Sequence, residues 1–442
     1  MKNIKLAYLL LIAGLTALWL LADNILSIPY DFFAYRASLI NYSGIIGIGV
    51  MSVGMILAMR PAALEPLLGG LDKGYRLHKW LGITGLVVSV LHWLLANGPK
   101  WMVGWGWMER PQRGPRIEQT NTVFAFFDSQ RHLAESVGEW AFYGAVVLMV
   151  VALVKWFPYR YFFKTHRILA IAYLALVAHA VILMKFDYWG EVVGPLMAVL
   201  MAAGSVAAVI SLTRKVGNQR KARGTIEELD YHAENRVLKV AIKLASPWAG
   251  HKAGQFAFVT FDPAEGPHPF TIASAWQGDG RLFFLIKGIG DYTRSLPGSL
   301  QEGAPVSIEG PYGRFEFESD KPRQIWVAGG IGITPFIARM QSLVGKPDAP
   351  AIDLFYSTSA PDKGFIERIR QIADAARIRL HVLVADKDGR LNAERIRQQV
   401  PDWNRSDVWF CGPAGFGSAL RRDFALSGLS ADDFHQELFD MR

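Results

Sequence analysis

The chain has one cysteine, Cys411, among its 442 residues. A single thiol excludes an internal disulfide bond, and it excludes an iron–sulfur cluster held by several thiolates. Charged residues are few, at 19% of the chain, and no aspartate or glutamate lies in the apolar segments 77–96 and 168–184. These two segments therefore lack the carboxylates and thiolates that many protein metal sites use.

Six long apolar segments lie in the first half of the chain. Most of them reach or approach the ~20 residues that a helix needs to cross the hydrocarbon of a bilayer. The first is long and lacks a small-residue cleavage site, so we interpret it as a retained helix rather than a signal peptide. The sequence predicts a membrane α-helical bundle of six spans in residues 1–213. The segments are Leu6–Ala22, Leu39–Met59, Leu77–Ala96, Val137–Val154, Ile168–Met184 and Val192–Leu212.

Basic residues are distributed asymmetrically along this half. With six spans, the lysines and arginines of residues 2–5, 60–79, 155–167 and 214–223 all fall on one side. Such an excess marks the cytoplasmic side. We therefore expect a plasma (inner) membrane protein whose N-terminus and soluble part are cytoplasmic. The net charge of +8 comes largely from these flanks, so we expect contact with the lipid bilayer and no nucleic-acid binding.

Four histidines accompany two of the apolar segments: His78 and His92 the third, His166 and His179 the fifth. Neutral imidazole is a good axial ligand of haem iron, so two helices with two histidines each can hold two haems. Any one of these histidines could instead be a polar residue hydrogen-bonded to a neighbouring helix. Four of them at near-matching spacings favour haem.

The spacings indicate how the histidines pair. His78 and His92, 14 positions apart, lie about 21 Å apart along a helix and within roughly 40° of one face. His166 and His179, 13 positions apart, point roughly 140° apart, so they need a kink, a π-bulge or haems approached from different sides. The third and fifth spans run in the same direction. We therefore expect His78 to face His166 at an inner haem and His92 to face His179 at an outer one.

The sequence changes character near Arg214, where short alternating apolar stretches replace the long ones. Residues 214–320 predict a β-barrel, with strands at Val237–Leu244, Gln255–Phe261, Leu282–Lys287 and Pro305–Glu309. Residues 321–442 predict a parallel α/β domain, because strands alternate with helices. Its strands are expected at Gln324–Ala328, Ala351–Ser357, Arg379–Leu383 and Asp407–Cys411.

A glycine-rich turn follows the first strand of the α/β domain and opens a helix. It reads Gly329-Gly330-Ile331-Gly332-Ile333-Thr334-Pro335. Backbone N–H groups of such a turn can bind a phosphate, although glycines also serve tight packing. The spacing departs from the dinucleotide-binding G-x-G-x-x-G pattern.

Several motifs in order identify a resemblance. These are His268-Pro269-Phe270-Thr271-Ile272-Ala273-Ser274, Gly310-Pro311-Tyr312-Gly313, the glycine-rich turn, Phe410-Cys411-Gly412-Pro413 and Glu437-Leu438-Phe439. Together they resemble the ferredoxin-reductase-type FAD/NAD(P)H module. Joined to the two histidine pairs, nearly the whole chain resembles the ferric reductase and NADPH oxidase superfamily of transmembrane flavocytochromes b.

The resemblance implies a role for each matching residue. His78, His92, His166 and His179 would bind two haems b. His268, Pro269, Phe270, Thr271 and Ser274 would contact FAD, with Thr271 near the reactive edge of the flavin, and Lys287, Gly288 and Thr293 would line the FAD pyrophosphate. Gly329, Gly330, Gly332 and Thr334 would hold the phosphates of NADPH or NADH, and Cys411, Gly412 and Pro413 would lie beside the nicotinamide. Phe439 would stack on the flavin and move before hydride transfer; Cys411 and Phe439 could instead be ordinary buried residues.

The activity implied is an NAD(P)H-dependent ferric reductase or an NADPH oxidase-like activity. NAD(P)H gives up two electrons as a hydride and haem iron accepts one at a time, so a flavin must lie between them. Electrons would reach a ferric chelate or dioxygen on the outer face. The alternative is an electron conduit that supplies a docked partner protein.

Two features bear on the donor and the acceptor. Ser357 and Thr358 could bond the 2′-phosphate of NADPH, and Lys363 and Arg368 are the nearest basic residues. Oxygen-reducing members of the superfamily resemble one another in an outer arginine, which Arg36 matches, and in a histidine one turn beyond the outer ligand, where this chain has Ala96. Arg36 could equally be a lipid-facing anchor.

Overall fold

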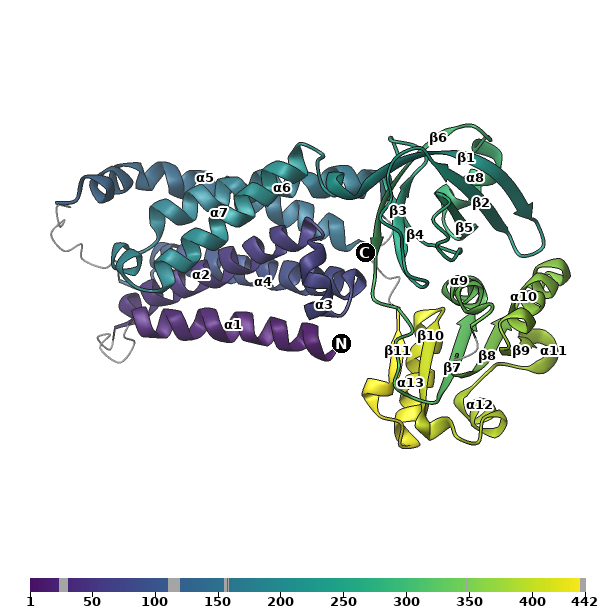
Figure 1. Cartoon of the computed structure of the whole chain (residues 1–442). Coiled ribbons are helices and arrows are strands. Elements are labelled where there is room, and N and C mark those ends of the chain that lie inside the picture. Colours follow the sequence, from purple (N-terminus) through teal and green to yellow (C-terminus); the bar gives the residue numbers. More distant parts are fainter. Residues whose placement is uncertain (24–30, 110–119, 155–156, 158, 347–348, 438–442) are drawn as a thin grey trace. The chain divides into compact units, whose positions relative to one another are not determined.

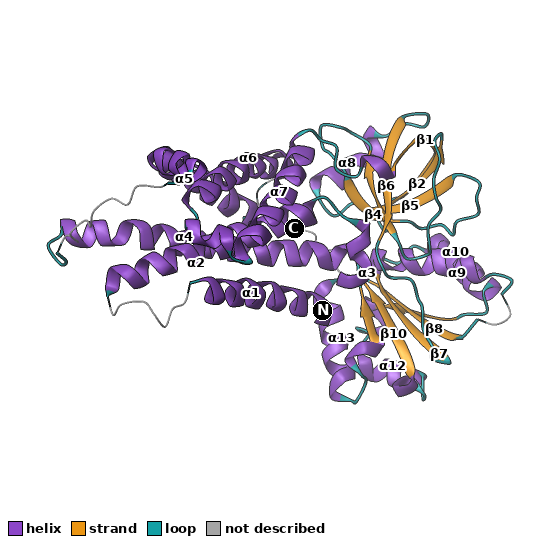
Figure 2. Cartoon of the chain, turned by 60° about the vertical axis from the view of Figure 1, so that its left-hand side comes forward, coloured by secondary structure: helices purple, strands orange, loops and turns teal. Residues whose placement is uncertain are grey.

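The structure is a computed structural model that describes residues 1–23, 31–109, 120–154, 157, 159–346 and 349–437. The chain forms two compact units, and the boundary along the sequence lies between Val216 and Gly217. The first unit is helical. The second unit contains the β-strands, which are orange in Figure 2.

Within the described residues, six helices of the first unit are long and apolar enough to cross a membrane. They lie alongside one another as a bundle (Figure 1). The prediction of six spans is thus confirmed. The helices are α1 (Lys2–Ala22), α2 (Phe32–Ala58), α4 (Leu71–Gly104), α5 (Thr122–Leu153), α6 (Tyr159–Leu183) and α7 (Val193–Leu212), with the short α3 (Glu65–Leu68) between α2 and α4.

Two helices are much longer than their apolar segments. Helix α4 has 34 residues and α5 has 32, so each extends about 50 Å and exceeds the ~30 Å thickness of bilayer hydrocarbon. Asn121 caps α5 by accepting hydrogen bonds from the backbone N–H groups of Val123 and Phe124. Hydropathy marks only the part of a helix that suits lipid, so the expected spans Leu77–Ala96 and Val137–Val154 leave out these polar extensions.

The helical unit is packed through small and polar contacts between α2, α6 and α7. The Tyr173 hydroxyl of α6 lies 2.8 Å from the Ser52 hydroxyl of α2. A Cβ on Gly204 of α7 would lie 2.1 Å from the same tyrosine oxygen, so glycine is required for α7 to approach. Small residues at such crossings are typical of helices that associate in a membrane.

The first half of the second unit is a six-stranded antiparallel sheet with strand order β4-β3-β6-β1-β2-β5. An antiparallel bridge between Ile272 and Phe284 joins the two ends of the order and closes the sheet on itself. The β-barrel expected from the sequence is therefore present. Its elements are β1 (Lys221–His232), β2 (Val237–Leu244), β3 (Phe256–Thr260), β4 (His268–Thr271), β5 (Arg281–Lys287), α8 (Asp291–Ser299) and β6 (Pro305–Tyr312).

The second half is a five-stranded parallel sheet with strand order β11-β10-β7-β8-β9. Helices connect the strands, as the expected α/β alternation requires. The elements are β7 (Arg323–Gly329), α9 (Thr334–Leu343), β8 (Ala351–Thr358), α10 (Lys363–Ala375), β9 (Arg379–Val384), α11 (Ala385–Asp388), α12 (Ala393–Gln399), β10 (Ser406–Cys411), α13 (Ala414–Leu426) and β11 (Phe434–Gln436).

Three strands were not expected from the sequence, and each has a physical reason. Strand β1 is charged on its exposed face and carries a register shift between Ile226 and Glu228, which interrupts its alternation. Strand β4 is short and contains Pro269, as suits its place at the end of the strand order. Strand β11 has three residues and pairs only with β10.

A buried carboxylate ties three strands of the parallel sheet together. Asp353 of β8 accepts hydrogen bonds from Arg323 of β7 at 2.7 Å, Arg379 of β9 at 2.7 Å and His381 of β9 at 3.2 Å. Burial alone would raise the pKa of Asp353, but the hydrogen bonds from His381 and Arg379 outweigh it and hold this pKa below its usual value. The ionised form of Asp353 therefore stabilises the folded sheet.

We predict that Asp353→Asn lowers the free energy of unfolding of the second unit by about 2 kcal/mol at neutral pH. This is less than the cost of breaking a fully buried ion pair, because Arg379 is largely exposed. The Asp353 pKa is depressed, so its contribution is complete above about pH 4 and is lost as pH falls further. Scanning calorimetry of the whole protein measures this, with the exposed Asp386→Asn as the control. Equal stability of the two variants at pH 7 would contradict the prediction.

Candidate functional site

Helices α4 and α6 bring the four histidines together in two pairs. The ring centroids of His78 and His166 are 5.9 Å apart, and those of His92 and His179 are 6.3 Å apart. This is the pairing expected from parallel spans. The planes of the rings differ by 69° in the first pair and by 77° in the second.

These separations suit one metal ion between two imidazoles. A ligating imidazole nitrogen lies about 2 Å from a first-row metal ion, so two rings on opposite sides of one ion have centroids roughly 6 Å apart. Within the described part of the chain, no group of three or more His, Cys, Asp or Glu side chains could hold a metal ion. Haem iron, whose other ligands come from a macrocycle, needs only such a pair of axial histidines.

Backbone carbonyls orient three of the four rings. The Nδ1 atoms of His78, His92 and His179 lie 2.9, 3.1 and 2.8 Å from the carbonyl oxygens of Gly54, Ile40 and Ala134 respectively. A carbonyl oxygen can only accept, so each Nδ1 carries a proton and donates it. The His92 Nδ1 also lies 3.0 Å from the Ser43 hydroxyl, whose own proton is donated to the Leu39 carbonyl at 2.8 Å, so the serine oxygen is left to accept as well. In the neutral ring this leaves the lone pair on Nε2, the arrangement found around histidines that ligate metals.

The fourth ring, His166, is held differently. Its Nδ1 is buried and has no hydrogen-bond partner among the described residues. The ring instead stacks on Phe162, one turn earlier in α6, with centroids 5.0 Å apart and planes within 21°. His166 is thus positioned by packing rather than by a carbonyl.

The 13-residue spacing of His166 and His179 is accommodated without a break in α6. Helix α6 is α-helical from Tyr159 to Leu183 and contains no proline. His179 lies against α5, where a Cβ on Gly138 would be 2.0 Å from its Nδ1. Of the three solutions that the sequence left open, approach from different sides agrees with this continuous helix.

In the antiparallel domain, His268 starts β4 and stacks on Tyr292 of α8, with ring centroids 4.3 Å apart. The His268 Nδ1 donates to the Gly266 carbonyl at 3.2 Å. Burial lowers the pKa of His268, and this hydrogen bond opposes the shift. The imidazole is therefore neutral at pH 7. Any contact that His268 makes with a phosphate relies on hydrogen bonding rather than on charge.

The rest of this motif is built into the barrel wall. Pro269 and Phe270 pair with Phe258 and Ala257 of β3, and Thr271 pairs with Phe256. Thr271 and Ser274 are buried. The Ser274 hydroxyl accepts from the Phe283 N–H of β5 at 3.2 Å, so this side chain also holds the β4–β5 closure.

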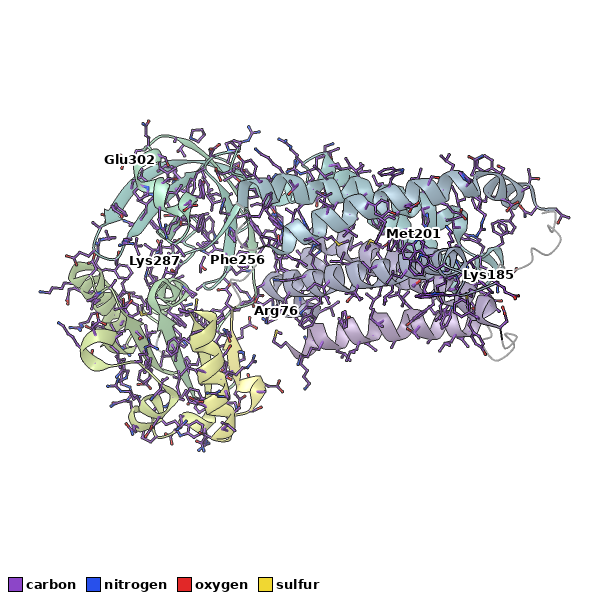
Figure 3. All side chains as sticks on the ribbon, turned by 180° about the vertical axis from the view of Figure 1, so that it is seen from behind. Arg76, Lys185, Met201, Phe256, Lys287 and Glu302 are labelled. Carbon is purple, nitrogen blue, oxygen red and sulfur yellow. The ribbon has the colours of Figure 1, made fainter. Side chains whose placement is uncertain are left out.

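The end of β5 reaches the glycine-rich turn of the parallel domain. The Lys287 ammonium nitrogen, whose residue is labelled in Figure 3, lies 3.7 Å from the place that a Cβ on Gly330 would occupy. The Gly288 N–H donates to the Arg236 carbonyl at 3.0 Å. The Thr293 hydroxyl accepts from the N–H groups of Ile289 and Gly290 at 3.0 Å each, so it shapes the turn that starts α8.

The glycines of the nucleotide turn have different reasons to be glycine. A Cβ on Gly329 would lie 2.8 Å from Pro413, and one on Gly332 would lie 2.1 Å from the Cys411 carbonyl oxygen. These two positions serve the close packing of the turn against the end of β10. Gly330 has a φ of 55°, and among the described residues only the Lys287 ammonium comes near the place of its missing Cβ. Such an open glycine suits a position where a ligand approaches the backbone.

Three further predicted residues lie at or beside this turn. Gly412 has a φ of 159° and approaches Gly329 closely, and Thr334 donates to the Ile331 carbonyl at 2.6 Å. Cys411 is fully buried; burial and then Glu437 raise the pKa of its thiol, so it stays protonated at pH 7. Phe439 lies outside the described residues.

The two basic residues that follow β8, Lys363 and Arg368, differ in their contacts. Arg368 lies 3.6 Å from the Asp230 carboxylate and 3.3 Å from His232 Nε2, both on β1 of the barrel. Its guanidinium is therefore already engaged with side chains of β1. Lys363 is exposed at the start of α10.

Sequence reasoning missed several residues that shape these sites. Tyr292 directly precedes Thr293, which the sequence did single out, so a place beside the flavin motif could have been suggested for it. Gly138 carries a weaker signal, as a glycine in an apolar helix. The carbonyls that orient the histidines have no sequence signal, because every residue has one.

Comparison with protein families places both halves of the chain. Residues 43–177 match the ferric reductase like transmembrane component, and residues 225–316 match an FAD-binding domain. The first match contains His78, His92 and His166, and the second contains the His268–Ser274 motif.

Individual proteins match parts of the chain to different extents. An NADPH oxidoreductase of Mycobacterium tuberculosis is 31% identical over 39% of this chain and 47% of its own length. A flavohemoprotein of Oceanobacillus iheyensis is 25% identical over 34% of this chain and 40% of its own. The chain thus spans less than half of either relative. The solved flavohemoglobin of Malassezia yamatoensis is 17% identical over 91% of this chain and 98% of its own, at a TM-score of 0.48.

These findings confirm the resemblance and the fold class expected from the sequence. The chain is a multi-pass membrane protein that carries an FAD-binding domain. With a ferric reductase-like transmembrane component joined to an FAD-binding domain, it has the domain composition of a ferric reductase or NADPH oxidase-type flavocytochrome.

Proposed function

We propose that the chain carries electrons from NAD(P)H across the membrane, through FAD and two b-type haems, to a ferric chelate or dioxygen on the outer face. The observation that carries this proposal is that the four histidines form two facing pairs, with ring centroids 5.9 Å apart in one pair and 6.3 Å apart in the other. Their ligands are 14 residues apart on α4, so the pairs lie about 21 Å apart along that helix and close to the two faces of a bilayer. Bound FAD would accept a hydride and release single electrons to haem iron.

The chain's part at the haems is to present neutral imidazoles. The carbonyls of Gly54, Ile40 and Ala134 hold three rings so that Nε2 is available to iron. Because the helical unit is apolar around these groups, each Nδ1 donor keeps its carbonyl partner instead of a water molecule. His78 with His166 would hold the inner haem and His92 with His179 the outer one.

At the flavin, the chain's part is to bind and orient. The stacked His268 and Tyr292 rings and the buried Thr271 and Ser274 form the wall that the FAD-binding domain match includes. Lys287 lies beside the open position at Gly330, where its charge favours binding of a phosphate. Cys411 acts by its shape, since its thiol stays protonated.

The direction of transfer follows from the positive-inside distribution of the basic flanks. The soluble unit would take NAD(P)H from the cytoplasm, and the acceptor would lie outside. A docked partner protein could replace the small acceptor. Purified protein distinguishes the two, because a conduit reduces its haems with NAD(P)H but does not turn over ferric chelate or dioxygen.

We predict that His92→Ala or His179→Ala removes the outer haem and that His78→Ala or His166→Ala removes the inner one. Iron that loses an axial ligand is held less tightly. Haem per chain should fall by about half while NAD(P)H still reduces the flavin, as measured by the haem absorbance of purified variants. His132→Ala is the control, since this histidine is exposed on α5. Unchanged haem content and spectrum in His92→Ala would refute the assignment.

We also predict that the fragment 214–442 binds FAD weakly and oxidises NAD(P)H with an artificial acceptor. All predicted flavin and nucleotide residues lie within it. Fluorescence titration measures FAD binding, and dye reduction measures turnover. Lys287→Ala in the same fragment should weaken FAD binding about tenfold, because a charge-assisted contact with the phosphate is lost. A folded fragment that never binds flavin would show that the domain interpretation is wrong.

Truncation before Phe439 is predicted to change hydride transfer far more than haem content. The residue is proposed to act only at the face of the flavin, so the helical unit should be unaffected. Stopped-flow absorbance of the truncated protein separates the two readouts, and an internal surface change such as Asp386→Asn serves as the control. Flavin reduction at the wild-type rate would remove Phe439 from the site.

A further inference from the structure

Helix α4 contains a proline shortly after the outer histidine. Pro99 lies inside the helix, seven residues beyond His92, and is buried. Proline has no backbone N–H, so it cannot donate to the carbonyl four residues earlier, and its ring crowds that carbonyl. The carbonyl concerned is that of Leu95. In a membrane helix a carbonyl without a donor is costly, and another group must satisfy it.

Arg36 of α2 supplies that group. Its Nε donates to the Leu95 carbonyl oxygen at 2.6 Å, and its Nη2 donates to the Ala96 carbonyl oxygen at 2.9 Å. Arg36 thus uses two of its N–H groups on the backbone of α4, one of them on the carbonyl that Pro99 leaves without a helical donor.

The same two helices meet again at His92. On α2, Ile40 is one turn beyond Arg36, and its carbonyl accepts from the Nδ1 of His92 at 3.1 Å. On α4, Ala96 is one turn beyond His92, and its carbonyl accepts from Arg36. At this one junction α2 therefore donates a hydrogen bond to α4 through Arg36, and α4 donates one to α2 through His92. A shift of α4 at Leu95 and Ala96 would move the ring of His92 relative to Ile40.

We propose that Arg36 is a positioning residue for the outer haem ligand: its guanidinium replaces the amide donor that Pro99 lacks and fixes the turn of α4 that carries His92. This differs from both readings of Arg36 that the sequence left open. A lipid-facing anchor would direct its donors to the membrane surface, and a group that stabilises a reduced acceptor would act through its charge. Here the donors are directed to the backbone of a neighbouring helix.

A double-mutant cycle in the full-length protein tests the proposal. Arg36→Ala leaves the Leu95 carbonyl without a donor and should weaken retention of the outer haem about tenfold. Pro99→Ala restores an amide at position 99. The double variant Arg36→Ala with Pro99→Ala should therefore regain most of the outer haem, together with its low-spin electron paramagnetic resonance signal. Arg36→Lys should retain more outer haem than Arg36→Ala but less than the wild type, because an ammonium can reach only one of the two carbonyls.

Arg131→Ala is the matched control, since this arginine of the same unit is half-exposed and pairs with Glu135 on its own helix. It should leave both haems unchanged. If the double variant holds as little outer haem as Arg36→Ala, the arginine acts through its charge and the proposal is wrong. Retention of the outer haem in Arg36→Ala would also overturn it.

The haem readout rests on the proposed function, so a second readout separates the two. The melting temperatures of the four members of the cycle, measured on haem-free protein, should be non-additive, because the second change repairs the first. A wild-type protein without an outer haem but with a non-additive cycle would refute the proposed function and leave the role of Arg36 standing. Additive melting temperatures would refute the role of Arg36.

Discussion

The hydrogen bond from a histidine Nδ1 to a backbone carbonyl inside an apolar bundle is the interaction on which the proposed electron path depends. It satisfies the ring where no water competes, and it fixes which nitrogen keeps a lone pair. Gly54, Ile40 and Ala134 provide these carbonyls from α2 and α5. The helices that carry no ligands are therefore as necessary to the sites as α4 and α6. The Arg36 contact is of the same kind, since its side chain donates to the Leu95 carbonyl, which has no helical donor because residue 99 is a proline.

The soluble unit meets a different constraint, because its binding surfaces must bring two nucleotide cofactors together. Gly329 and Gly332 pack against the end of β10, whereas Gly330 is left open beside Lys287. The close packing holds the turn, and the open glycine allows approach of a ligand. In this arrangement Cys411 contributes bulk and no thiolate, since burial keeps its thiol protonated. The chemistry that converts a hydride into single electrons is the flavin's, and the protein supplies position.

The sequence predicted those parts of the structure that have a periodic or compositional signal. The six spans, strands such as β2 and the alternation of the parallel domain followed from such patterns, and the pairing of His78 with His166 followed from helix geometry. It did not predict β1, whose register shift breaks the alternation, or the polar ends of α4 and α5, which hydropathy does not mark. Tertiary partners such as the carbonyl of Ala134 and the glycine at 138 were beyond its reach, because their role depends on which helices become neighbours. Arg36 was correctly singled out, but only the contact with Leu95 gives it a role.

Electron transfer across the membrane is the central claim, and sealed proteoliposomes test it most directly. The purified protein is reconstituted with a ferric chelate trapped inside, and membrane-impermeant NAD(P)H is added outside, so that only molecules with the soluble unit facing outward are reduced. The account predicts reduction of the haems followed by appearance of ferrous iron inside the vesicles. Oxidation of NAD(P)H by an external acceptor, with the trapped chelate remaining ferric and the haems oxidised, would contradict it.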